Sequence, residues 1–244
     1  MNFFKYYSAG KDASVESILA PLKYHALRYV SADQFNDPYD SKIFFETLDG
    51  KREDAFSDVI NKHLRIASMS RNPSSPIMWS HYASHHAGYI LEYELDSQFP
   101  YQKVEYEKLK PFYYSTQEMK SIILSKYPDI SDSEVEVMMK KELLENEKFM
   151  KNLWAAIMTK HNDWVYEDEY RFIDVNPSGI KDAHIDKPLE TKRIRSIILG
   201  YRFDHEKLDD ELRSIINSTY ESLVVYKAEP SMEEYSMNIR AYSL

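Results

Sequence analysis

Cysteine is absent from this chain of 244 residues, and glycine occurs only 5 times. Without cysteine there is no disulfide framework, no thiol nucleophile and no cysteine-based zinc site. The few glycines form neither a GxGxxG motif nor a Walker-type loop, which are common backbone cradles for phosphate groups. The sequence therefore argues against a dinucleotide site of the Rossmann type.

Long hydrophobic runs are also missing. No apolar run approaches the roughly 20 residues that a membrane helix needs, and residues 1–5 lack the charged-then-apolar pattern of a signal peptide. The formal net charge of -9 argues against broad nonspecific binding to nucleic acid, although it leaves room for a local basic groove. We expect a soluble cytoplasmic protein that makes no contact with membranes.

Hydrophobic residues make up 43% of the chain, which is enough for a sizeable core. No linker or internal repeat divides the chain, so we expect one domain over residues 1–244. Periodicity predicts strands at residues 3–8, 26–31, 43–47, 66–70, 89–95, 170–175, 193–199 and 222–228, and helices at residues 13–22, 53–64, 79–86, 117–127, 133–159 and 205–216. The predicted fold class is α+β: a mixed, twisted sheet with flanking helices and a helical insertion or lid near residues 115–160.

The most informative stretch is MWSHYASHHAGYILEY at residues 78–93. It holds three of the eight histidines, and histidine titrates near neutral pH. The predicted helix would feed the next strand through a glycine turn, so that Trp79, His81, Tyr82 and His86 gather at the junction. The stretch is a candidate ligand site, and the alternative is a half-buried helix whose rings are solvated or capped.

A second cluster lies in KHNDWVYEDEYRF at residues 160–172, chiefly from Trp164 onward. If strand geometry begins near Glu167, then Glu167, Glu169 and Arg171 share one face. Two carboxylates on one face can raise one pKa while a neighbouring arginine lowers the other. Such a pair can orient a sugar hydroxyl and stabilise a cationic transition state, and the alternative is a salt bridge at the edge of a strand.

The acidic segment FNDPYD at residues 35–40 could bind a cation or substrate hydroxyls, or could only form a turn. His81 and His85 would share a helix face and could ligate one metal ion, but no glutamate follows His81, so the zinc-protease pattern fails. We expect no metal. A metal-dependent hydrolase or nuclease built from these histidines with Asp37 and Asp40 is one alternative function.

These clusters together resemble the uncharacterised bacterial family called domain of unknown function 2971. The matching pieces follow the family's order, at residues 4–6, 35–40, 78–88, 164–171 and 197–200. The resemblance implies no settled activity, and members look like accessory or defence-associated proteins of bacteria.

A more distant resemblance is to the ADP-ribosyltransferase superfamily. Its Glu-x-Glu pattern is matched by residues 167–169, and Tyr82 or Tyr89 matches the tyrosine or serine of a middle strand. The first element departs from the pattern, because the opening strand offers Lys5 and Tyr6 where the superfamily has histidine or arginine.

The resemblance implies a transferase or glycohydrolase that takes NAD or another nucleotide-like small molecule as substrate and a protein or nucleic acid as target. Such an enzyme would act as a toxin or phage-defence effector. Glu169 would stabilise an oxocarbenium-like sugar, and Glu167 would orient the acceptor or a ribose hydroxyl. Tyr82 and Trp79 would stack on a ring, and His81 would orient a group or shuttle a proton. A noncatalytic ligand-sensing or partner-binding domain is the other alternative.

The candidate residues fall into two sets. The catalytic candidates are Glu169, Glu167, His81 and Tyr82, and the substrate-binding candidates are Trp79, Lys5, Tyr6, Asn36, Asp37, Asp40, His86, Trp164 and Arg171. If the clusters form one site, side-chain atoms of His81 or Tyr82 should come within about 8 Å of Glu167 or Glu169, the span of one small ligand group.

Overall fold

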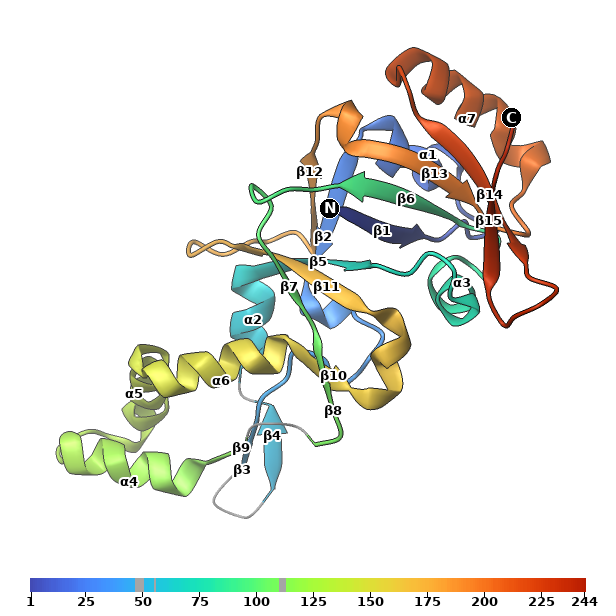
Figure 1. The fold of residues 1–244 in the computed structure, drawn as a ribbon. Helices are drawn as coiled ribbons and strands as arrows, with labels where there is room; N and C mark the ends of the chain where they lie inside the picture. Colours follow the sequence, from blue (N-terminus) through green and yellow to red (C-terminus); the bar gives the residue numbers. More distant parts are fainter. Residues whose placement is uncertain (47–50, 55, 110–112) are drawn as a thin grey trace.

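The structure is a computed structural model that describes residues 1–46, 51–54, 56–109 and 113–244. A mixed, twisted sheet with flanking helices forms its centre (Figure 1), which confirms the α+β prediction. Ten of the described strands make this sheet, in the order β12-β2-β5-β1-β6-β13-β14-β15, with β11 and then β7 added beside β5. Their bounds are β1 Asn2–Tyr7, β2 Ala26–Val30, β5 Leu64–Ser70, β6 Tyr89–Glu94, β7 Tyr101–Lys103, β11 Glu169–Val175, β12 His184–Pro188, β13 Ile194–Leu199, β14 Val224–Pro230 and β15 Met237–Ala241.

The sheet forks along β5. One edge of β5 pairs antiparallel with β11 along its whole length. The other edge meets two strands at single positions, Ile66 with Val30 of β2 and Ser70 with Phe4 of β1. Among the described strands, none pairs with that edge between these two points, so a gap opens there beside Ser68.

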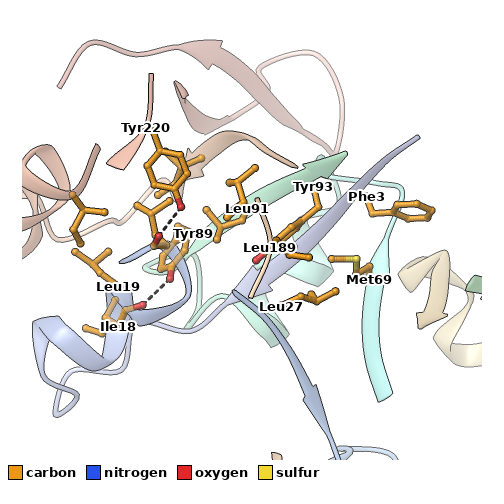
Figure 2. Packing of buried hydrophobic residues seen from close by; sticks show 14 of the residues in the cluster. Phe3, Ile18, Leu19, Leu27, Met69, Tyr89, Leu91, Tyr93, Leu189 and Tyr220 are labelled. Carbon is orange, nitrogen blue, oxygen red and sulfur yellow. Dashed lines mark hydrogen bonds between the residues drawn. The ribbon is translucent and has the colours of Figure 1, made fainter. Parts of the chain in front are cut away.

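The larger hydrophobic core lies between the sheet and the helices α1 (Val15–Lys23) and α7 (His205–Thr219). Figure 2 shows two buried tyrosines of this core, Tyr89 and Tyr220, whose hydroxyl groups donate to backbone carbonyls of helix α1. Tyr89 Oη donates to the carbonyl of Ile18, and Tyr220 Oη donates to that of Leu22, both at 2.6 Å. These tyrosines pack in the core, and each hydroxyl group has a backbone carbonyl as its hydrogen-bond partner. Their burial therefore needs no ligand to explain it.

A helical segment lies at the opposite end of the molecule from α7 (Figure 1), where the sequence predicts the insertion. It consists of α4 (Thr116–Lys126), α5 (Asp132–Glu145) and α6 (Glu147–Ile157). Helix α6 buries Phe149 and Leu153 in a second core, against Phe56 and Ile60 among others. Every helix among the described residues is too short or too polar to cross a membrane.

The remaining elements are short. Two small sheets pair β8 (Glu105–Glu107) with β10 (Thr159–His161), and β3 (Phe44–Glu46) with β4 (Arg52–Asp54) and β9 (Tyr113–Ser115). The other helices are α2 (Ser57–His63), α3 (Pro76–Tyr82) and the 3₁₀ turns η1 (Ala32–Gln34), η2 (Asn162–Glu167) and η3 (Thr191–Arg193).

Two predicted helices are wrong in extent. The helix expected over residues 133–159 is two helices, because the side chain of Asn146 accepts from Phe149 N at 3.0 Å and caps a new helix there. The helix expected over residues 53–64 begins only at Ser57, because residues 52–54 pair with β3. In residues 52–54 the free energy gained by strand pairing outweighs the local preference for helix that the apolar spacing indicates. Residue 55, inside the predicted helix, and residue 47, at the end of the strand expected over residues 43–47, lie outside the described residues.

The helix expected over residues 79–86 also ends early, at Tyr82. Residues 84–86 all have positive φ angles, of 47°, 52° and 72°, and His86 N donates back to the carbonyl of Trp79 at 3.1 Å. Such left-handed backbone costs free energy in residues other than glycine and needs tertiary support. The close packing of Gly200 against this turn gives that support. A Cβ atom at residue 200 would lie 2.1 Å from the His86 carbonyl oxygen, so only glycine fits there.

Candidate functional site

A pocket of about 380 Å³ opens at the fork of the sheet. Its size falls in the range of small-molecule sites, and aromatic and polar groups converge on it. Strands β1 and β5, helix α3, the segment after β2 and the segment from β10 to β11 all contribute to its wall. The lining residues are Phe4, Lys5, Tyr6, Val30, Gln34, Phe35, Asn36, Asp40, Ser68, Met69, Ser70, Met78, His81, Tyr82, Lys160, Glu167 and Glu169.

A buried ion-pair network lies against this wall, with Arg171 at its centre. The Arg171 guanidinium bonds Glu169 through Nε at 2.8 Å, Asp40 through both terminal nitrogens at 2.9 and 2.6 Å, and the carbonyl of Ile157. Arg171 is 1% exposed and is not among the lining residues. A second bond to Glu169, from Nη2 at 3.2 Å, is the fifth, so all five N–H groups of the guanidinium are taken up by the protein.

Lys160 brings the two glutamates of the 167–169 segment together. Its Nζ lies 2.5 Å from Glu167, 3.2 Å from Glu169 and 3.7 Å from Asp40. The same ammonium group lies 4.9 Å from the centre of the Trp164 ring, within cation–π range. Three carboxylates thus share the two cations Lys160 and Arg171, and one negative charge in the cluster has no cation of its own.

All three carboxylates of this cluster line the pocket, and Glu167 is the one that contacts Tyr82. The hydroxyl of Tyr82 donates to Glu167 Oε1, and Tyr82 Oη in turn accepts from Asn36 Nδ2 at 2.9 Å. The distance expectation is confirmed, because Tyr82 and Glu167 are in direct contact. Glu167 reaches the pocket from the end of η2, not from a strand as predicted, because Asp168 adopts a left-handed conformation with φ 40° and turns the chain before β11 begins.

The two glutamates have opposite pKa shifts. Burial raises the pKa of Glu167, the ammonium of Lys160 opposes that shift, and the nearby charge of Glu169 adds to it, so the pKa stays above its usual value. Burial also acts to raise the pKa of Glu169, but Arg171 and Lys160 lower it by more, so it lies well below its usual range. Glu169 therefore stays ionised, and Glu167 is the carboxyl group that can gain and lose a proton nearer neutral pH.

A group of rings lies at the edge of the pocket. His81 is exposed and its Nδ1 lies 3.0 Å from the hydroxyl of Tyr166, a bond whose donor depends on the histidine tautomer. The ring of His81 also packs edge-on against Tyr82 and Trp164. Trp164 thus lies beside the pocket without lining it, and it contacts the site through Lys160 and His81.

Eight of the thirteen candidate residues line the pocket. They are Lys5, Tyr6, Asn36, Asp40, His81, Tyr82, Glu167 and Glu169. Five lie elsewhere, namely Trp79, Asp37, His86, Trp164 and Arg171. The structure thus brings together residues from four distant parts of the sequence, and it separates some that are neighbours in the same motif.

Four of the five candidate residues outside the pocket have a clear structural role. Trp79 is fully buried and donates from Nε1 to the Pro73 carbonyl at 2.8 Å, so it cannot stack on a ligand. The carboxylate of Asp37 accepts from Tyr39 N at 2.8 Å and closes a turn, on the side of a separate cavity. His86 belongs to the left-handed turn after α3, and Arg171 is saturated by ion pairs.

The metal alternative loses its geometric basis. His81 lies on α3, whereas His85 follows the end of the helix in left-handed backbone, so the two side chains do not share a helix face. Within the described part of the chain, no three histidine, aspartate or glutamate side chains are grouped to hold a metal ion. Tyr89, one of the two tyrosines matched to the superfamily pattern, is fully buried in the main core.

Lys160 is the most important residue that the sequence reasoning missed. Ser68 and Ser70 were missed as well, although a signal for them exists. In the strand Leu64–Ser70 they alternate with Ala67 and Met69, and two serines on one face of this largely apolar strand indicate that this face meets something polar. Lys160 carries no such signal, since lysines are frequent and mostly exposed.

Fold and site together define an α+β protein with a pocket at a fork in its sheet, bordered by a buried charge network. A family model described as "Protein of unknown function (DUF2971)" matches residues 78–172. The matched segment runs from α3 to β11 and carries both halves of the Tyr82–Glu167 contact, and it supports the resemblance to that family. No curated protein and no solved structure matches the chain.

Proposed function

We propose that the pocket binds a nucleotide-like small molecule such as NAD, and that the protein acts on it as a transferase or glycohydrolase of the ADP-ribosyltransferase type. The observation that carries this proposal is the pair of buried glutamates with opposed pKa shifts in one aromatic-lined pocket. Neighbouring carboxyl groups whose pKa values are driven apart are the arrangement by which enzymes obtain an acid and a charge-stabilising base from one residue type.

The two glutamates then have different roles. Glu167, with the raised pKa, is the group that donates a proton to the leaving group or takes one from the acceptor. Glu169, which stays ionised, faces the positive charge that develops on the sugar as the glycosidic bond breaks. Tyr82 orients Glu167 through its hydroxyl group, and the rings of Phe4, Tyr6 and Phe35 offer apolar faces for a base or a sugar.

The saturation of Glu169 favours a second candidate, a noncatalytic ligand-binding domain. Its carboxylate already bonds Arg171 and Lys160, which makes the network a stable wall for a ligand without any chemistry. The two candidates share the pocket and differ in turnover. The metal-dependent alternative has no comparable observation in its favour.

The test uses the full chain with NAD, followed by chromatography for released nicotinamide and by calorimetry for binding. We expect Glu167→Gln to lower turnover at least about a hundredfold, the scale of one lost catalytic group, while NAD still binds. Glu107→Gln is the matched control, because Glu107 is exposed on β8 and outside the pocket. Binding without turnover in the wild-type protein would support the noncatalytic candidate, and full turnover by Glu167→Gln would remove Glu167 from the mechanism.

A role as a toxin or phage-defence effector would follow from the same activity on a cellular nucleotide. Expression of the wild-type chain should then slow bacterial growth or protect cells from phage, and Glu167→Gln should do neither at equal protein level. Equal effects of the wild type and Glu167→Gln in cells would mean that the biological role does not depend on the proposed chemistry.

A further inference from the structure

Lys5 occupies the gap where the sheet forks. It lies on β1 next to Phe4, the single position at which that strand pairs with β5 in the described structure. Its Nζ donates to the carbonyl of Ser68 at 3.1 Å, at a point where the edge of β5 has no strand partner among the described residues. The side chain lines the pocket, so its ammonium group bridges the gap from within the site.

The ammonium group has bonding capacity left over. A lysine carries three donors, and the bond to Ser68 uses one of them. No carboxylate of the described residues forms a salt bridge with Lys5, in contrast to Lys160, which contacts three. A partly buried cation in a pocket, with donors to spare and no counter-ion in contact, is suited to an anion that enters from solvent.

The charged groups around Lys5 do not act as its counter-ion. Glu169 on β11 and Asp186 on β12 act on it at longer range, and Arg28 on β2 repels it. Asp186 is held by Arg28 through two bonds of 2.8 Å, and Glu169 is held by Arg171. Burial is the main cause that lowers the pKa of Lys5, to about 8, so the side chain is charged at neutral pH and a bound anion would raise its pKa again.

The backbone beside Lys5 supplies a second donor. In a β-strand the N–H and the C=O of one residue point toward the same edge. Since the carbonyl of Ser68 faces Lys5 across the gap, the N–H of Ser68 is directed to the same side. A ligand anion in the gap would thus meet an ammonium group and a backbone amide together, a common way to hold a phosphate.

We infer that Lys5 forms an anion subsite at the fork of the sheet and holds a phosphate group of the ligand. This inference rests on the proposed function for the rest of the ligand and adds where its charged end lies. The phosphate contacts β1 and β5 at the gap, and the sugar contacts Glu167 and Tyr82 on the other wall of the same pocket.

The experiment measures binding to the full chain by calorimetry, with AMP, adenosine, inorganic pyrophosphate and malonate as probes. We expect Lys5→Met to weaken pyrophosphate and AMP about tenfold, the scale of one charge-assisted hydrogen bond, and to leave adenosine unchanged. Lys192→Met is the matched control, because it removes the same charge from an exposed side chain outside the pocket. The wild-type affinity for pyrophosphate should fall as the pH rises through 8 and beyond, and that of Lys5→Met should not.

Three results would overturn the inference. Equal affinity of Lys5→Met and wild type for pyrophosphate, with only a change in melting temperature, would mean that Lys5 merely ties β1 to β5. Equal loss in the Lys192→Met control would mean a nonspecific charge effect, and tighter binding of malonate than of pyrophosphate would assign the subsite to a carboxylate.

The outcome is separable from that of the proposed function. Lys5-dependent binding of pyrophosphate without any turnover of NAD would sink the enzyme proposal and leave the anion subsite standing. If turnover depends on Glu167 but Lys5→Met binds AMP as tightly as wild type, the enzyme proposal stands and the anion subsite is refuted.

Discussion

The charge cluster beside the pocket has two sides that use the same residue types in different ways. On the side of Arg171, every donor of the guanidinium is bonded to Glu169, Asp40 or backbone. On the side of Glu167, one carboxylate is shared by Tyr82 and Lys160 and lines the open pocket. Only one residue, Asp168, separates Glu167 from Glu169 in the sequence.

The comparison shows that burial alone does not set the protonation state of a carboxylate. Both glutamates are buried, at 3% and 4% exposure, yet pairing with Arg171 and Lys160 keeps Glu169 as a fixed negative charge. Incomplete pairing leaves Glu167 able to change its protonation state, which is the property that acid–base chemistry needs. Three variants within the cluster, and a fourth outside the pocket, test how far the two sides differ.

Arg171→Met should produce the largest effect. It leaves Asp40 and Glu169 buried beside Lys160 alone, and the loss of one partner from a buried ion pair costs about 3–5 kcal/mol. Urea denaturation measures the free energy of unfolding. The control is Arg28→Met, since the Arg28–Asp186 pair is equally short at 2.8 Å but its side chains are 40% and 41% exposed, and exposed pairs contribute about 1 kcal/mol or less. Equal losses in the two variants would contradict the framework role of Arg171.

Glu169→Gln and Glu167→Gln should differ in the size and pH dependence of their effects. Because folding lowers the pKa of Glu169, its ionised form stabilises the fold above its unfolded pKa of about 4.3, and this is lost as the pH falls. Because folding raises the pKa of Glu167, its contribution is present below about pH 4.3 and is lost as the pH rises through the folded value.

At pH 7 we therefore expect Glu169→Gln to lose about 3 kcal/mol, as for a broken buried pair, and Glu167→Gln to stay within about 1 kcal/mol of wild type. Unfolding curves between pH 4 and pH 8 measure both differences. The deficit of Glu169→Gln should be constant near neutral pH and shrink as the pH falls toward 4. The deficit of Glu167→Gln should instead shrink or reverse as the pH rises. Parallel pH profiles would mean that the two carboxylates are in equivalent environments after all.

Asp37→Ala should have the smallest effect and should spare the pocket. Asp37 closes its turn onto Tyr39 N, and the loss of such a local cap costs about 0.5–2 kcal/mol. Ligand affinity should match that of wild type, because Asp37 lies outside the pocket that Asp40 lines. Asp210→Ala, an exposed position on α7, gives the baseline for melting. A loss of NAD or AMP binding without a loss of stability would return Asp37 to the site.

Much of the fold follows from local pattern, and its failures have physical causes. Alternation located seven strands of the central sheet, namely β1, β2, β5, β6, β11, β13 and β14, because one face of each must meet the core. Strands β7, β12 and β15 were missed, and the three residues of β7 carry too little periodicity to detect. The end of α3 was also missed, because its left-handed turn depends on Gly200, which lies more than a hundred residues away.

The sequence by itself determined that Tyr82 and Glu167 belong to unusual polar clusters, and that the chain is an α+β protein with helices near residues 115–160. Tertiary structure alone decided which members of those clusters meet. A motif fixes spacing along the chain, whereas pairing partners such as Lys160 and Arg171 are chosen by how β10, η2 and β11 pack in space. For that reason only the structure separates the glutamate that two cations hold in its ionised form from the one whose pKa is raised.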